Sequence, residues 1–277
     1  MKKEKRLKLM CRRFIFIILS ICLFSGIYNI FIAGDRPNAK KNVDIAQSND
    51  VLNEEEKNSE VKDNTEDKFK KESEKVVYLT FDDGPYKNTP ELLDLLDKYN
   101  VKATFFVTAQ FMNEEELIEM IKEIDERGHE VGVHTYSHRY DEIYSSVDAY
   151  INDYKKMDDI IYKATGKRSK IFRFPGGSNT GYNEDIRDEL ISTLENMGLT
   201  YYDWNAYNGD SDGFTAQEQI NKAVTESSYT NKSIVLMHDA PGKEEVLDTL
   251  PSIIEQLQEK GYEFHALDES IEPIQFE

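Results

Sequence analysis

The sequence has 277 residues, which is enough for one or two domains. Its 34 lysine and arginine residues are outnumbered by 53 aspartate and glutamate residues, giving a net charge of −19. This balance disfavours a nucleic-acid-binding protein, because phosphate backbones are bound by basic surfaces. Both cysteines, Cys11 and Cys22, lie near the N-terminus, which excludes a disulfide framework, a zinc finger or a catalytic thiol downstream. Any metal site there must use His, Asp or Glu.

The N-terminal part has the pattern of a signal anchor. Residues 1–13 form a basic segment with a net charge of +6, and residues 14–33 form an uncharged apolar run. About 20 such residues in a helix span the hydrocarbon layer of a membrane, and a basic flank stays in the cytoplasm. We therefore expect a single-pass anchor in the cell membrane with the rest of the chain outside. A long, cleaved signal peptide is the alternative, but the apolar run is longer than usual and no clear cleavage site follows it.

The remaining chain divides into a linker and a folded domain. Residues 34–75 carry a net charge of −3 and almost no aromatic or branched apolar side chains. Such a segment buries too little surface to offset its ordering entropy, so it is expected to be a disordered tether. Residues 76–277 carry a net charge of −22 and are long enough to bury a single core.

Strand and helix patterns alternate along residues 76–277. The expected strands are 76–81, 103–107, 130–134, 169–172, 200–203, 233–237 and 262–267. The expected helices are 89–99, 113–127, 145–166, 185–197, one that opens at the capping box of residues 215–218, and 244–260. This alternation requires parallel pairing with right-handed crossovers, which fits a doubly wound sheet or a barrel. Because the unusual polar residues fall at the carboxyl ends of several strands, we expect an α/β fold of the distorted (β/α)7 barrel type.

Two motifs at these strand ends are typical of metal sites. Asp82 and Asp83 follow the first strand, and two converging carboxylates repel each other unless a cation or a proton lies between them. His134 and His138 follow the third strand at a spacing that lets both imidazoles reach one ion. Two histidines and a carboxylate form a hydrolytic zinc arrangement. The alternatives are an ordinary Asp-Asp-Gly turn and a pair of surface histidines.

A second set of polar residues suggests acid–base chemistry. His238 ends the sixth strand, where it could be a core histidine, but Asp203 at a neighbouring strand end would orient it and raise its pKa. Arg173 is expected either to clamp a carboxylate or to form a surface salt bridge. The single tryptophan, Trp204, is expected in the core or on the wall of a sugar-binding cleft.

The two other histidines of the domain have no such partner. His129 precedes a strand and His265 lies within one, and neither has an acidic or His partner at metal-ligand spacing. Both are interpreted as structural.

Together these motifs resemble the polysaccharide deacetylase family, the NodB-homology domain of carbohydrate esterases. The resemblance covers about 200 residues and five motifs in order, and the combination of TFDDG with HxxxH is highly specific. The motifs are Thr80-Phe-Asp-Asp-Gly84, His134-Thr-x-x-His138, Arg173-Phe-Pro-Gly-Gly177, Asp203-Trp204 and Leu236-Met-His238. The family's fold, a distorted barrel of seven strands, is consistent with the expected elements.

The resemblance implies a metal site and an acid–base pair. Asp83, His134 and His138 would bind one divalent metal ion, usually zinc, with cobalt or another divalent ion as alternatives. Asp82 would be the general base that takes a proton from the attacking water, and His238 would protonate the leaving amine.

Supporting roles follow from the same motifs. Asp203 would tune His238, and Arg173 would hold Asp82. The backbone N–H after Pro175, which belongs to Gly176, would stabilise the oxyanion together with the metal. Leu236 and Trp204 would line the pocket for the acetyl methyl group.

One position departs from the family pattern. Many relatives have a larger side chain just after the third-motif proline, where this chain has Gly176-Gly177. The backbone donor is retained, but a side-chain wall of the groove is missing. This difference leads us to expect a more open cleft.

The sequence therefore predicts a membrane-anchored, metal-dependent deacetylase that acts on an N-acetylated glycan outside the cell. The expected substrate is N-acetylglucosamine of peptidoglycan, and the protein is expected to be a monomer. Muramic acid residues, an N-acetylglucosamine exopolysaccharide, chitin oligomers and O-acetyl xylan remain alternatives, because the motifs define the chemistry and not the sugar. A non-catalytic glycan-binding module and an acidic envelope protein that recruits cations are the other classes considered.

Overall fold

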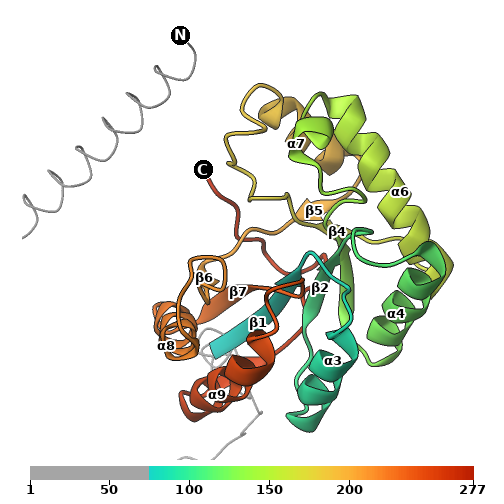
Figure 1. The fold of residues 1–277 in the computed structure, drawn as a ribbon. Coiled ribbons are helices and arrows are strands. Elements are labelled where there is room, and N and C mark those ends of the chain that lie inside the picture. Colours follow the sequence, from blue (N-terminus) through green and yellow to red (C-terminus); the bar gives the residue numbers. More distant parts are fainter. Residues whose placement is uncertain (1–74) are drawn as a thin grey trace, which may run out of the picture. The chain divides into compact units, whose positions relative to one another are not determined.

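The computed structural model describes residues 75–277, in which a curled sheet of parallel strands is covered by helices on its outer side (Figure 1). The strands are β1 (Lys75–Asp82), β2 (Thr104–Val107), β3 (Glu130–Val133), β4 (Ile171–Phe172), β5 (Thr200–Tyr201), β6 (Ala206–Tyr207), β7 (Lys232–His238) and β8 (Tyr262–Phe264). The helices are α3 (Thr89–Lys98), α4 (Glu114–Glu126), α5 (Tyr140–Ile143), α6 (Val147–Thr165), α7 (Arg187–Asn196), α8 (Ala216–Ser227) and α9 (Val246–Glu259).

The sheet order is β5-β4-β3-β2-β1-β7-β6, with β8 paired to β1 beside β2. Every pair is parallel, as the alternation of elements predicts. The described region has eight strands instead of seven, because β6 follows β5 with no helix between them and pairs with β7. Since β5 and β6 lie at opposite ends of this order, the fold is a curled half-barrel.

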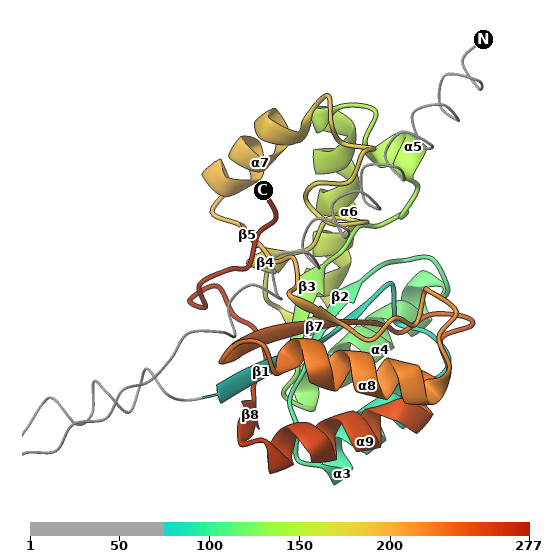
Figure 2. The same cartoon turned by 90° about the vertical axis from the view of Figure 1, so that its left-hand side faces the viewer.

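The helices form a belt on one side of the sheet. Contacts link α7 to α6, α6 to α4, α4 to α3, α3 to α9 and α9 to α8, in the order of the strands they cover. Figure 2 shows α3, α8 and α9 grouped at one end of this belt and α5, α6 and α7 at the other. Local signals define several helix ends: Ser146 caps α6, Gly166 ends it in a left-handed conformation, and Thr215 with Glu218 forms the expected capping box.

Strand alternation separates the two faces of the sheet. In β1, Val77, Leu79 and Phe81 belong to the large apolar cluster beneath the helices. Tyr78, between them, belongs to a smaller cluster with Phe106, Ile171, Tyr202, Ile234 and Leu267. Because side chains alternate along a strand, Thr80 and Asp82 share the face of Tyr78. This inner face carries the polar residues of the candidate site.

The expected anchor at residues 14–33 and the tether at residues 34–75 lie outside the described residues, apart from Lys75 at the start of β1. Among residues 75–277, no helix combines the length and apolar character needed to cross a membrane.

Candidate active site

Parallel pairing gathers the motif residues at one end of the sheet. Asp82 is the last residue of β1 and lies directly opposite His238, the last residue of β7. His134 and Arg173 immediately follow β3 and β4. The carboxyl ends of neighbouring parallel strands therefore place these four side chains around one point, as the sequence predicts.

Asp83, His134 and His138 form a three-residue cluster at this point. Their potential ligand atoms all lie within 4.8 Å of one another. The Oδ1 atom of Asp83 is 3.1 Å from Nε2 of His138 and 3.5 Å from Nε2 of His134. Asp83 and His138 both have left-handed backbones, with φ of 76° and 54°. Such a conformation is uncommon for residues other than glycine and is found where the surrounding structure imposes it, often at functional sites.

The hydrogen bonds of His134 test whether the cluster fits a cation. Its Nδ1–H donates to the carbonyl oxygen of Arg173 at 2.8 Å, because a carbonyl can only accept. In the neutral ring, Nε2 is then an unprotonated acceptor that faces Oδ1 of Asp83 and, at 3.8 Å, Oδ2 of Asp82. Burial lowers the pKa of His134, which favours this neutral form. Acceptors that converge in this way match the donor set of a divalent ion such as zinc.

The turn that carries the two histidines is held from α6. The backbone N–H groups of Tyr136 and Ser137 both donate to the buried carboxylate of Asp153, at 2.7 and 3.2 Å. The N–H of His138 donates to the Thr135 hydroxyl. Asp153 was not singled out from the sequence, because an acidic residue in a helix carries no signal of what it contacts.

Arg173 is fully buried and binds Asp82. Its Nη1 donates to Oδ1 of Asp82 at 2.8 Å and to the Thr80 hydroxyl at 2.7 Å, and its Nε donates to the carbonyl of Tyr202. The guanidinium also lies 4.3 Å from the centre of the Phe106 ring. The interpretation of Arg173 as a carboxylate clamp is confirmed, and the surface salt bridge is wrong. With Oδ1 occupied by Arg173, Oδ2 of Asp82 faces the cluster.

The partner of His238 differs from the one expected. Its Nδ1 is 2.8 Å from Oδ1 of Asp210, and its backbone N–H donates to Oδ2 of the same carboxylate. Burial alone would lower the pKa of His238, but the hydrogen bond and charge of Asp210 raise it above its ordinary value. The expected pairing of His238 with Asp203 is therefore wrong. Asp210 lies in the segment between β6 and α8, and its position depends on the path of the chain after β5.

Asp203 instead binds two segments of the backbone. Its buried carboxylate accepts from the N–H and hydroxyl of Ser178, at 2.9 and 2.6 Å, and from the N–H of Phe276 at 2.8 Å. It therefore connects the loop after β4 to the C-terminal segment.

The loop of residues 175–178 places Gly176 at the surface, against Tyr140, whose ring packs on His138. Among residues 75–277, the Gly176 N–H donates no backbone hydrogen bond. Gly176 and Gly177 have φ of 78° and 86°, values that favour glycine. A Cβ on Gly176 would lie 3.1 Å from the Tyr140 hydroxyl, and one on Gly177 would lie 3.0 Å from the Phe276 ring. Phe276 therefore occupies the space beside Gly177, and the more open cleft at Gly176 stays a prediction.

The other predicted residues have simple surroundings. Leu236 is buried in β7 opposite Thr80, and Trp204 is half-buried with its ring against Phe276. Their role in an acetyl pocket stays a prediction. His129 is buried and accepts from the N–H of Ala103, with its pKa lowered to about 4 by burial.

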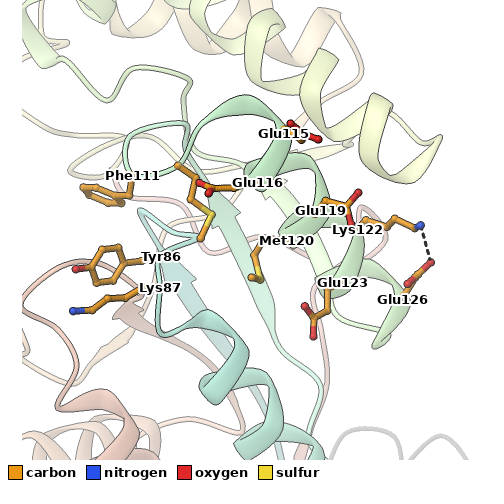
Figure 3. A pocket seen from close by; sticks show the side chains of 11 residues that line it. Tyr86, Lys87, Phe111, Glu115, Glu116, Glu119, Met120, Lys122, Glu123 and Glu126 are labelled. Atoms are coloured by element: carbon orange, nitrogen blue, oxygen red, sulfur yellow. Dashed lines mark ion pairs between the residues drawn. The ribbon is translucent and has the colours of Figure 1, made fainter.

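A separate hollow of about 980 Å³ lies beside α4 (Figure 3). Tyr86 and Phe111 face each other at one end, and the rest is lined mainly by residues of α4, with glutamates beside Met120 and Lys122. None of the metal-cluster or acid–base residues lines it. The candidate active site is thus defined by its chemistry and not by the size of a cavity.

Comparison with known proteins agrees with this geometry. The family model described as polysaccharide deacetylase matches residues 69–202. A peptidoglycan-N-acetylglucosamine deacetylase of Bacillus cereus is 34% identical over 76% of both chains. The chain belongs to the polysaccharide deacetylase family.

Two further relatives bear on the fold and the substrate. The crystal structure of the catalytic domain of a peptidoglycan N-acetylglucosamine deacetylase from Eubacterium rectale is 39% identical, with a TM-score of 0.69 over 73% of this chain and 93% of that one. A peptidoglycan-N-acetylmuramic acid deacetylase of Bacillus subtilis is 29% identical over 71% of both chains. The curled parallel fold is therefore that of the family.

Proposed function

We propose that this chain is a metal-dependent deacetylase that removes N-acetyl groups from an extracytoplasmic glycan, with N-acetylglucosamine of peptidoglycan as its substrate. The observation that carries the proposal is the placement of Asp82 and His238 opposite each other beside the Asp83–His134–His138 cluster. An acetamide is a poor electrophile with a poor leaving group, so its hydrolysis needs an activated water and a separate acid. The site has one residue suited to each task.

Each residue has a defined part in this reaction. A divalent ion held by Asp83, His134 and His138 would polarise the acetamide carbonyl and the attacking water. Asp82 takes the proton from the water as its oxygen bonds to the carbonyl carbon. The Gly176 N–H donates to the oxyanion. His238 then gives its proton to the sugar nitrogen as the C–N bond breaks, and acetate and a free amine remain.

The environment of the two acid–base residues suits these parts. Arg173 fixes one oxygen of Asp82 and leaves the other directed toward the cluster. Asp210 accepts from Nδ1 of His238, so the opposite ring nitrogen is the one that can deliver a proton. Because Asp210 raises the pKa of His238, more of the imidazole is protonated near neutral pH.

The substrate assignment is supported by the Bacillus cereus and Eubacterium rectale relatives, which are named for N-acetylglucosamine of peptidoglycan. We also propose that residues 14–33 anchor the enzyme in the cell membrane and that residues 34–75 carry its catalytic domain to the wall. The length of the apolar run and its basic flank support this location.

Acetate release by the full chain in detergent tests the reaction and the substrate. Purified peptidoglycan and N-acetylglucosamine oligomers are supplied separately, with zinc or with a chelator. We expect zinc-dependent release from peptidoglycan, with glucosamine as the new sugar. Release from the oligomers alone would indicate that the substrate is a chitin-like polymer or an exopolysaccharide. Muramic acid with a free amine in the treated peptidoglycan would indicate that N-acetylmuramic acid is the substrate.

A matched pair of variants links this activity to the site. Asp82→Asn should abolish acetate release. Asp188→Asn makes the same chemical change on α7, where the side chain is 96% exposed and pairs with Arg187 at 3.5 Å, and should leave activity intact. Equal activity in the two variants contradicts the proposal.

A further inference from the structure

Residues 268–277 run along the inner side of the half-barrel and end beside the candidate active site. The Tyr202 hydroxyl lies 2.9 Å from the carbonyl oxygen of Asp268 and 2.5 Å from that of Ile271, and its one O–H can donate to either. Farther along, the N–H of Asp203 donates to the carbonyl of Ile274 at 2.8 Å. In Figure 2 this segment is the dark red trace that ends at the C-terminal mark, near β5 and α7. The segment thus reaches the residues that follow β5.

Phe276 contacts the loop that carries the expected oxyanion donor. Its ring lies where a side chain on Gly177 would be, with two ring carbons 3.0 and 3.2 Å from a Cβ built there. The same ring packs edge-on against Trp204, with centroids 4.9 Å apart. Gly177 is the residue next to Gly176, so the Phe276 ring lies against the backbone that aims the Gly176 N–H.

A buried carboxylate joins the same two segments. Oδ2 of Asp203 accepts from the Ser178 hydroxyl at 2.6 Å and from the Phe276 N–H at 2.8 Å, and Oδ1 accepts from the Ser178 N–H. Asp203 is fully buried, so the loss of a donor leaves part of a charge unsatisfied. The position of Ser178 is therefore coupled to that of Phe276 through one side chain.

We propose that Phe276 is a positioning residue for the deacetylation reaction, which holds the Pro175–Ser178 loop through its ring on Gly177 and through Asp203. In this arrangement Asp203 positions the Pro175–Ser178 loop and does not orient His238. The kinetic test of this inference rests on the proposed function. The packing of the Phe276 ring, on which the inference depends, can be tested without substrate.

Trp204 provides that substrate-free readout, because it is the only tryptophan in the chain. Phe276→Ala removes the ring that packs on Trp204. We expect a red-shifted emission maximum and stronger quenching by acrylamide in this variant, and an intermediate change in Phe276→Leu. Tyr229→Ala, which removes an aromatic side chain that is 75% exposed, should leave both signals unchanged. Unchanged Trp204 emission in Phe276→Ala overturns the placement of the ring.

Acetate release by the full chain then tests the positioning role. Misplacing a catalytic group by about 1 Å can cost about a hundredfold in rate, so we expect kcat of Phe276→Ala to fall at least about tenfold with KM nearly unchanged. Phe276→Leu should recover part of this loss, and bound metal per chain should equal that of the wild type. A wild-type kcat in Phe276→Ala, or a loss confined to KM, overturns the inference.

These results separate the two proposals. If the unsubstituted chain releases no acetate, the proposed function fails, and the Trp204 measurements still decide whether Phe276 packs as described. If the unsubstituted chain is active and Phe276→Ala retains its kcat, the inference alone fails. Thermal unfolding of each variant shows whether a loss of activity is caused by loss of the fold. If Phe276→Ala does not fold, Phe276→Leu is compared kinetically with the wild type.

Discussion

Replacement of Asp210 by asparagine tests the acid side of the proposed mechanism. Asp210 accepts two hydrogen bonds from His238, one from Nδ1 and one from the backbone N–H, and only 4% of its side chain is exposed. Asparagine has a single acceptor oxygen and no charge, so it can replace only one of these bonds and cannot favour the imidazolium.

The size of the effect follows from the loss of charge. A hydrogen bond to a charged partner contributes about 1.5–3 kcal/mol and a neutral one about 0.5–1.5 kcal/mol, so the protonated form of His238 loses roughly 1–1.5 kcal/mol. At about 1.4 kcal/mol per pKa unit, the pKa of His238 should fall by about one unit. Because a general acid must be protonated to act, the alkaline limb of kcat/KM moves to lower pH by the same amount.

The assay is the pH profile of acetate release, measured for the wild type, Asp210→Asn and Asp203→Asn. On the alkaline side, Asp210→Asn should be about tenfold less active than the wild type, with a smaller difference at lower pH. Asp203→Asn should keep the wild-type alkaline limb, since Asp203 contacts Ser178 and Phe276. The reasoning is refuted if the limb moves in Asp203→Asn and stays in place in Asp210→Asn.

Three further predictions concern stability and the metal. Arg173→Met leaves Asp82 buried without its partner and should lower the free energy of unfolding by about 3–5 kcal/mol in a denaturant titration, whereas a loss below about 1 kcal/mol would match a surface pair. Burial raises the pKa of Asp239 from 3.8 to about 7, so the folded protein retains a proton that the unfolded chain releases, and stability falls by up to about 4 kcal/mol as the pH rises through this window. Asp239→Asn keeps an acceptor for Thr89 but cannot ionise, so the difference in unfolding free energy between pH 5 and pH 8 should shrink; an unchanged difference contradicts this assignment. Metal analysis should find one tightly bound ion per chain that is lost in His134→Ala, while many weak ions retained in that variant would indicate a general acidic surface.

Most of the fold is predictable from local patterns. The capping residues Ser146 and Thr215 fix helix starts by hydrogen bonds within a few residues, so they can be read directly from the sequence. Strand β6 could not be predicted, because two residues carry no periodicity and Ala206–Tyr207 is defined only by its pairing with β7. The count of seven strands differs from the structure for this reason.

The Asp83–His134–His138 cluster was also predictable, because its residues follow the carboxyl ends of parallel strands. Asp83 directly follows β1, and His134 and His138 are four residues apart after β3, so parallel pairing alone brings them together. The same reasoning offers Arg173 as a carboxylate clamp, and the resemblance to the family implies Asp82 as its partner. Its complete burial depends on the packing of Phe106, Tyr202 and Thr80 around it, which the sequence does not reveal.

The sequence by itself determined the parallel α/β architecture, the Asp83–His134–His138 cluster and the end of the sheet at which these residues meet, because the succession of strand and helix patterns along the chain is a local property. Only the tertiary structure decided which carboxylate serves His238 and what fills the space beside Gly177. Asp203 and Asp210 are both acidic residues near strand ends, and the chain path after β5 brings Asp210 to His238. Phe276 is 99 residues from Gly177, and contacts at that separation arise only when the whole half-barrel has folded.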